Sequence, residues 1–179
     1  MGILSFNGNK VITTGGGGAL LTKSKEFYEK AKHLSTQAKV KHKWEYIHDD
    51  IGYNFRMPNI NAAIGCSQFD KISKLISYKR KLARKYEMIF RNLDNVKFFK
   101  EPKQSISNYW LNTIIIEKNF KSIRNDLLKR LHNNGYQARP LWEPLNRLKM
   151  YKTCPSDNLD VTNDIVSRTI NLPSGYNII

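Results

Sequence analysis

Apolar residues in the first third of the chain form two short runs and one helical pattern. Residues 2–6 and 19–22 are largely apolar, and they flank a polar turn rich in glycine. These segments predict two buried strands joined by that turn. Ser24 follows as a helix cap, with Glu26 in the first turn and apolar residues at helical spacing after it. The polar and basic segment 39–50 predicts a loop.

A longer helical pattern begins near residue 59 and continues to residue 93. Apolar residues recur there three and four positions apart, and lysines and arginines fill the opposite face. An unbroken helix of this length would run on the order of 50 Å, at about 1.5 Å per residue. That is long for one compact domain, and it suits a helix that links two. Gly65 marks a place where the helix could bend or pack closely.

The last part of the chain returns to strand patterns. Residues 96–99 and 110–116 are rich in branched and aromatic residues, which predicts two strands. Ser122 is placed to cap an amphipathic helix that ends at Gly135. The remaining expected elements are an extended segment at 136–139, a helix near 161–169 and a strand at 171–173. This order of strands and helices indicates a small α+β unit.

The composition is that of a globular protein with an unusual charge. The 179 residues are 40% hydrophobic and 25% charged, and the formal net charge is +15. Three interpretations of this charge stay open: a nucleic-acid surface, attraction of a diphosphate substrate, or a lysine-rich habit on solvated faces. The basic residues are spread along the chain without a basic tract or a nucleic-acid motif, so we expect no nucleic-acid partner.

The same composition bears on compartment and metal content. No segment has the apolar length of a membrane span, and the N-terminus lacks a basic-then-apolar signal pattern. We therefore expect a cytoplasmic protein without a membrane partner. Cys66 and Cys154 lie far apart and form no Cys-x-x-Cys pair, which suits reduced thiols. The four histidines show no metal-binding spacing, so we expect no metal.

The most informative segment is the turn from Ser5 to Gly18, which has Lys10 near its tip. A turn between two strands places a lysine amine against a bound group. Such an amine attacks an aldehyde and later moves protons as general acid and base. A solvated surface lysine is the alternative in so basic a chain. The glycines at 15–18 also suggest a phosphate loop, but the Lys-Ser or Lys-Thr of a nucleotide P-loop does not follow them.

This turn closely resembles the cofactor-lysine segment of the nucleotide-sugar aminotransferases, a pyridoxal-phosphate family of fold type I. The resemblance implies that Lys10 holds the cofactor as a Schiff base. It also implies that the Ser5 hydroxyl binds the cofactor phosphate, with a serine that satisfies its own turn as the alternative. Sugar dehydratases of the same superfamily have a histidine in place of Lys10, so the lysine favours transamination. Many members of that family carry glutamate where Gly16 stands. What this glutamate contributes in them therefore stays open for this chain.

A second window, from Gly52 to Met57, resembles the family motif Gly-x-Asn-(Phe/Tyr)-Arg-Met. The resemblance implies that Asn54 reaches across the interface of a homodimer to the cofactor phosphate of the partner subunit. Its amide can donate two hydrogen bonds, which suits that role. The alternative is an asparagine that satisfies only its own loop.

A third segment, from Arg139 to Pro144, resembles the family's Arg-x-x-Trp-x-Pro segment at the substrate entrance. Arg139 is then placed to bind a diphosphate through two nitrogens, and Trp142 to pack on a sugar or a base. An interior tryptophan beside a salt-bridged arginine is the alternative.

The resemblance also implies the fold class and the domain division. It covers nearly the whole chain, and the family has a large cofactor domain before the lysine that matches Lys10. We therefore expect an α/β protein that is the C-terminal part of a fold type I pyridoxal-phosphate-dependent transferase. Residues 1–75 are expected to be the distal part of the large pyridoxal-phosphate-binding domain with the start of the linking helix. Residues 76–179 are expected to form a small C-terminal α+β domain.

The implied function is amination of a nucleotide-linked keto-sugar by an amino-acid donor, glutamate, for surface-glycan or amino-sugar biosynthesis. Pyridoxal 5'-phosphate is the implied cofactor, and a homodimer is the implied assembly. The aspartate that pairs with the pyridine nitrogen in the family lies upstream of the matched region, so we expect little or no activity from the isolated chain. Two alternatives stay open: a catalytically dead remnant, and a basic module that binds nucleic acid or an acidic partner.

Overall fold

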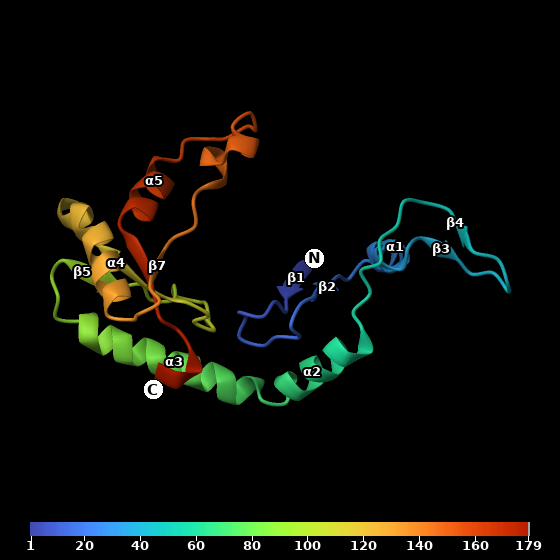
Figure 1. Ribbon diagram of the computed structural model, residues 1–179, viewed down its shortest axis with the longest axis horizontal. Helices are drawn as coiled ribbons and strands as arrows, with labels where there is room; N and C mark the ends of the chain where they lie inside the picture. Colours follow the sequence, from blue (N-terminus) through green and yellow to red (C-terminus); the bar gives the residue numbers. More distant parts are fainter. Residues whose placement is uncertain (179) are drawn as a thin grey trace. The chain divides into compact units, whose positions relative to one another are not determined.

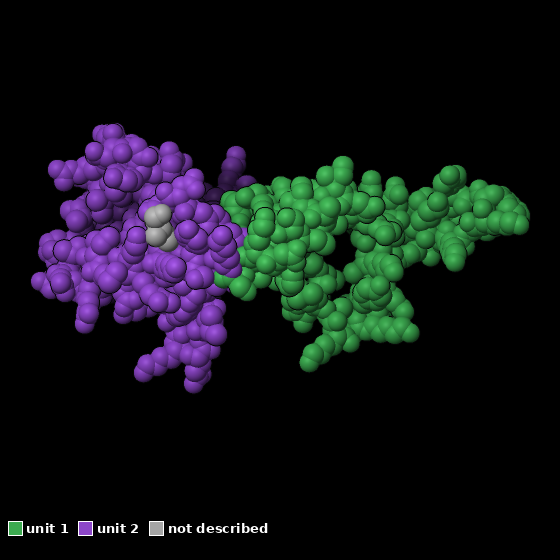
Figure 2. Space-filling view, turned by 90° about the horizontal axis from the view of Figure 1, so that it is seen from below, with its two compact units in different colours: residues 1–73 green, residues 74–179 purple. Residues whose placement is uncertain are grey.

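The structure is a computed structural model that describes residues 1–178. The chain divides into two compact units, Met1–Ser73 and Lys74–Ile179, which Figure 2 shows in different colours. Both units contain helices and strands (Figure 1). None of the helices within the described residues is both long enough and apolar enough to cross a membrane.

The first unit contains two antiparallel strand pairs and two helices. Its elements are β1 (Gly2–Ser5), β2 (Gly18–Leu21), α1 (Lys25–Ser35), β3 (Lys39–Val40), β4 (Ile47–His48) and α2 (Asn59–Phe69). β1 pairs with β2, so the two strands predicted around the lysine turn are confirmed. The segment predicted as a loop at 39–50 instead contains the β3–β4 hairpin. Val40 faces Ile47 in this pair, and facing branched residues stabilise paired strands.

Unit 1 buries little of its own apolar surface. Within residues 1–73, only Val11, Thr14 and Ala38 are buried, whereas Ile3 of β1 is 78% exposed. The prediction that the strands around the lysine turn are buried is therefore wrong for this structure. A two-stranded sheet has no second layer of its own, so its faces stay exposed unless another element covers them.

The long helix predicted between residues 59 and 93 is interrupted. The break falls at Asp70 and Lys71, where α2 ends and α3 (Ile72–Phe90) begins, and not at Gly65. The Lys71 N–H donates to the carbonyl three residues back, at 3.1 Å, which is a tighter turn than that of an α-helix. Aspartate suits a helix interior poorly because its side chain competes for backbone hydrogen bonds.

One predicted helix cap is confirmed and the other is wrong. The Ser24 Oγ accepts a hydrogen bond of 3.2 Å from the N–H three residues later, at the start of α1. Ser122 lies inside a 3₁₀ turn, Lys118–Ile123, and α4 (Arg124–Asn133) begins only after it. A capping residue is extended, and Ser122 is already in helical backbone. Gly135, with φ of +81°, ends this helix as predicted.

The second unit is built on one four-stranded antiparallel sheet, in the order β5–β6–β8–β7. The strands are β5 (Val96–Phe98), β6 (Asn112–Ile116), β7 (Arg139–Pro140) and β8 (Thr169–Leu172). The helices are α3, α4 and α5 (Asp160–Ser167), with further 3₁₀ turns at 145–147, 149–151 and 176–178.

The core of unit 2 lies between this sheet and the helices α3 and α4. Ile114 and Ile116 alternate with half-buried residues along β6 and are 1% and 0% exposed. Ile170 of β8 faces Ile114 across the strand pair and is 0% exposed. Ala83 of α3 belongs to the same cluster, and leucines of α4 pack against it. The strand predicted at 110–116 is confirmed, and because side chains alternate between the two faces of a strand, every second residue of β6 is buried in the core.

Unit 2 contains an ion pair between Arg80 and Glu101 that is expected to affect its stability in acid. Arg80 donates to both oxygens of Glu101, at 2.7 and 2.9 Å. These bonds, with a further bond from the Ser107 N–H, lower the pKa of Glu101 to about 2. A carboxyl whose pKa is lowered on folding stabilises the fold above its ordinary pKa, and that contribution is lost as the pH falls from 4.5 to about 2.

We therefore expect Glu101→Gln to flatten the dependence of unit 2 stability on pH between about 4.5 and 2. Urea midpoints measured at several pH values in that window check the prediction. An equally steep loss of stability in the variant would show that Glu101 is not the group that titrates.

Candidate functional site

The lysine turn, residues 6–17, joins β1 to β2. Phe6 holds its two arms together: its N–H donates to a carbonyl of the glycine segment at 2.9 Å, and its carbonyl accepts from the Thr14 N–H at 3.0 Å. Near the tip, the Lys10 N–H donates to the Asn7 carbonyl at 3.0 Å and closes a tight turn. Lys10 is half-buried. The structure therefore places this lysine in a restrained turn.

Helix α2 supports the turn through Thr14, which is 3% exposed. The Asn61 side-chain amide donates to the Thr14 carbonyl at 2.6 Å, and the Thr13 N–H donates to the Gln68 side chain at 3.4 Å. Gly65 packs so closely that an added Cβ would lie 2.9 Å from the Thr14 methyl group. These contacts tie the glycine-rich arm of the turn to one face of α2.

Sequence reasoning missed Asn61 and Gln68 as supports of the turn. They are seven residues apart in α2, which places them on the same face two turns apart. Polar side chains at that spacing, on the same face of the helix, are the signal that could have found them. A cavity of about 390 Å³ also lies beside the turn. Its lining includes Cys66 but neither Lys10 nor Ser5, so it is not the site predicted from the sequence.

Ser5 ends β1 and stands opposite Gly18 in the strand pair. A Cβ at Gly18 would lie 2.6 Å from the Leu4 carbonyl oxygen, so only glycine allows the strands to approach here. Ser5 is exposed, and its oxygen accepts a long hydrogen bond of 3.4 Å from the Asn7 N–H. Its O–H proton has no acceptor among residues 1–178. Ser5 and Lys10 therefore share one hairpin.

Asn54 lies in the loop after β4, also in unit 1. It pairs with Thr36, at the end of α1, through an isolated β-bridge. The N–H groups on either side of Asn54 donate to the last carbonyls of α1, at 2.7 and 3.0 Å. The Asn54 side chain is exposed, and its amide has no hydrogen-bond partner within the described part of the chain. The alternative that Asn54 satisfies its own loop with its side chain does not fit this geometry.

Arg139 and Trp142 lie in unit 2, in β7 and just after it. The Arg139 guanidinium donates to the Gln137 side chain at 2.9 Å and lies 3.2 Å from His132 Nε2. Among residues 1–178, Arg139 forms no ion pair with an acid. Trp142 is 64% exposed. An interior tryptophan beside a salt-bridged arginine is therefore not what the structure contains.

Trp142 stacks on Trp110, and the buried Lys79 holds the backbone of Trp110 in place. The Trp142 ring stacks on Trp110, with 5.9 Å between centroids and 26° between planes. Lys79 is 6% exposed, and its ammonium donates to the carbonyls of Trp110 and Ser174. Burial lowers the pKa of Lys79. Lys79 was not predicted, because the helical pattern places the lysines of this segment on the solvated face.

Comparison with known proteins identifies the family. The profile of the DegT/DnrJ/EryC1/StrS aminotransferase family matches residues 1–178. The chain belongs to this family. The family resemblance predicted from the windows around Lys10 and Asn54 is thereby confirmed.

Relatives within the family include sugar-modifying enzymes. EpsN of Bacillus subtilis (strain 168), described as a pyridoxal phosphate-dependent aminotransferase, is 35% identical over 99% of this chain and 46% of EpsN. GDP-perosamine synthase of Vibrio cholerae is 36% identical over 95% of this chain and 46% of the synthase. The structure of Helicobacter pylori PseC, an aminotransferase involved in the biosynthesis of pseudoaminic acid, matches with a TM-score of 0.91 and 27% identity.

The match to PseC covers 99% of this chain and 48% of PseC. The chain thus spans about half the length of these family members. The match confirms the predicted fold class, the C-terminal part of an α/β aminotransferase.

Proposed function

We propose that the protein is a pyridoxal-phosphate aminotransferase that transfers an amino group from an amino-acid donor, glutamate, to a keto-sugar carried on a nucleotide. We place this reaction in the cytoplasm and in amino-sugar or surface-glycan biosynthesis. Family membership supports the reaction class, and a relative named for a GDP-linked amino sugar supports the substrate class. The observation that carries the proposal is the restrained position of Lys10 at the tip of the β1–β2 turn.

The residues of unit 1 fit pyridoxal phosphate. Lys10 provides an amine for the aldehyde, and Ser5, on the same hairpin, provides a hydroxyl for the phosphate. Asn54 adds an amide that the described residues leave unpartnered. Phosphate groups are held by such neutral and charged donors. When bound, pyridoxal phosphate supplies the aldehyde that takes up the amino group and the ring that withdraws electrons.

Each side chain then has a distinct task. Lys10 Nζ would hold the cofactor at rest and would be released as a free amine when the amino donor takes its place. The free amine would then take a proton from the α-carbon of the donor as general base and, in the second half-reaction, deliver one to the sugar carbon as general acid. The turn holds the Lys10 backbone, so only the side chain has to move. Ser5 and Asn54 donate hydrogen bonds to the cofactor phosphate. In unit 2, Arg139 binds the diphosphate of the substrate and Trp142 packs on its sugar or base.

Exposed apolar residues support a homodimer in which Asn54 serves the partner's cofactor. Ile51, Tyr53 and Phe55 flank Asn54 and are 79%, 49% and 76% exposed. Exposed apolar clusters mark protein interfaces. In the homodimer this loop contacts the partner subunit, and the Asn54 amide donates to the phosphate held there.

The exposed faces of β1 and β2 support the proposed domain division. Residues 1–75 then belong to the large cofactor domain, whose other elements cover these strands, and residues 76–179 form the small domain. The boundary between the two compact units, after Ser73, lies close to this division.

Reduction of the holoenzyme with borohydride tests the assignment of Lys10. We expect peptide mass spectrometry to find the pyridoxyl label on Lys10, because its amine is the one held against the aldehyde. Lys10→Gln should lose both the label and transamination. Lys23→Gln is the matched control. Lys23 is an exposed lysine just after β2, and its variant should keep both the label and transamination. A pyridoxyl label on another lysine would refute the assignment.

A further inference from the structure

The loop that carries Asn54 completes the C-terminal end of α1. The last carbonyls of an α-helix have no partner inside the helix. Here the Tyr53 N–H donates to the Leu34 carbonyl at 2.7 Å, and the Phe55 N–H donates to the Ser35 carbonyl at 3.0 Å. Asn54 lies between these two donors, so the end of α1 determines where the Asn54 backbone lies.

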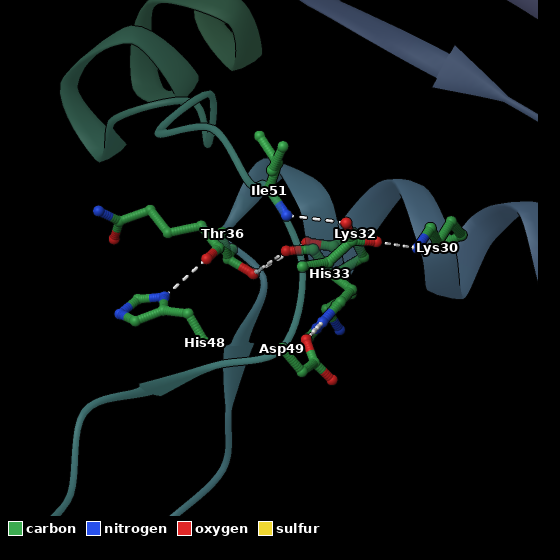
Figure 3. Close-up of polar contacts among 9 residues, drawn as sticks. Lys30, Lys32, His33, Thr36, His48, Asp49 and Ile51 are labelled. Atoms are coloured by element: carbon green, nitrogen blue, oxygen red, sulfur yellow. Dashed lines mark hydrogen bonds and ion pairs between the residues drawn. The ribbon is translucent and has the colours of Figure 1, made fainter.

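Side chains of α1 hold the preceding part of the same loop. His33 Nε2 lies 2.5 Å from Asp49 Oδ1, and Lys30 forms an ion pair with Asp50. Figure 3 shows the first contact, with His33 on α1 and Asp49 on the chain just after β4. His33 and Lys30 are three residues apart, which places them on one face of the helix. The contacts therefore act on adjacent residues of the loop.

Both partners of the Lys30–Asp50 pair are charged at neutral pH. The hydrogen bond between them lowers the pKa of Asp50 and raises the pKa of Lys30. Asp50 also accepts a hydrogen bond of 2.8 Å from the Ile51 N–H, which fixes the direction of its carboxylate. This pair thus combines an ion pair with a local turn of the loop.

Apolar packing does not hold this part of unit 1. Residues 41–51 are all exposed, and Ala38, where the loop meets α1, is the buried residue nearest to it. Polar contacts with α1, and with residues 36–38 just after it, therefore restrain the path of the chain from β4 to Asn54.

We propose that the pairs His33–Asp49 and Lys30–Asp50 together form a clamp, the α1 clamp, that positions Asn54 for the phosphate of the cofactor. This inference rests on the proposed function, which assigns phosphate binding to Asn54. His33 and Lys30 are positioning residues, because they act on Asn54 through the loop. An amide in a binding site must be held within about 0.5 Å of its productive place. In an exposed loop, contacts such as the α1 clamp provide that precision.

The double variant Asp49→Asn, Asp50→Asn in the holoenzyme tests the α1 clamp. We expect hydrogen exchange of the Tyr53 and Phe55 amides to accelerate on the order of tenfold, since the Lys30–Asp50 ion pair and the His33–Asp49 contact are both weakened. The dissociation constant of pyridoxal phosphate should rise by a similar factor. The Tm should stay nearly constant, because exposed ion pairs add little to global stability.

Two control variants separate the clamp from a general loss of charge. Glu29→Gln removes an acid from the same helix, where Glu29 pairs with Lys25 at 3.7 Å and, among residues 1–178, forms no hydrogen bond or ion pair with the loop. It should change neither exchange nor cofactor affinity. The double variant Asp49→Glu, Asp50→Glu keeps both charges and should restore most of the protection. Unchanged exchange in the Asp-to-Asn variant would overturn the clamp, and faster exchange with unchanged cofactor affinity would overturn its positioning role.

Asn54→Ala distinguishes a failure of this inference from a failure of the proposed function. It should weaken cofactor affinity while leaving the exchange of the Tyr53 amide as it is. Unchanged cofactor affinity in Asn54→Ala would overturn phosphate binding by Asn54, whatever the exchange results for Asp49 and Asp50.

Discussion

A Gly52→Ala substitution is expected to displace the Asn54 loop from the end of α1. A Cβ at Gly52 would lie 2.1 Å from the Gln37 carbonyl carbon and 2.3 Å from the Ala38 nitrogen, and both are backbone atoms. The loop would have to retreat by about 1 Å or more to restore van der Waals distances. A displacement of about 1 Å in a supporting element can cost about 100-fold in rate. We expect a loss of that order in transamination by the holoenzyme.

Hydrogen exchange detects the displacement directly, because the amides of Tyr53 and Phe55 lose their acceptors on α1. Gly175→Ala is the matched control, since a Cβ there meets only the Ile178 side chain, at 3.9 Å. Parental exchange and activity in Gly52→Ala would show that the loop does not depend on this close approach.

Ile114→Ala is expected to lower the free energy of unfolding of unit 2 by about 2–5 kcal/mol. Ile114 is 1% exposed and lies on the central strand β6, where its neighbours on β5 and β8 are Phe98 and Ile170. Loss of its methyl groups leaves a cavity that the surrounding strands and helices cannot fill. Urea unfolding followed by circular dichroism measures the change.

Ile106→Ala provides the control for this core substitution. Ile106 is 88% exposed, so its loss should change the free energy of unfolding by no more than about 0.5 kcal/mol. Equal effects of the two substitutions would contradict the placement of the core around β6.

Local sequence patterns predicted those elements whose interacting residues lie close together along the chain. The β1–β2 hairpin, the Ser24 cap and the Gly135 stop depend on residues within one turn or one hairpin. The strand at β6 follows from its own run of branched residues. The roles proposed for Lys10 and Asn54 rest on short windows too, because each window resembles a motif of the family.

These local patterns could not predict contacts between residues that lie far apart along the chain. Asn61 supports Thr14 across 47 positions, and Lys79 donates to Ser174 across 95. The buried Lys79 and the exposed β1 both reverse the expectation from hydrophobicity alone. Burial depends on which elements pack on a residue, and periodicity within one element does not report its neighbours.

The amino-acid order alone was enough to establish the family, the lysine turn, the Asn54 window and most element positions, because each rests on nearby residues. The support of the site came from folding: α2 beneath the turn, α1 beneath the Asn54 loop, and Lys79 behind Trp110. These supports are hydrogen bonds and close approaches between segments far apart along the chain. They exist only once the backbone has brought those segments together.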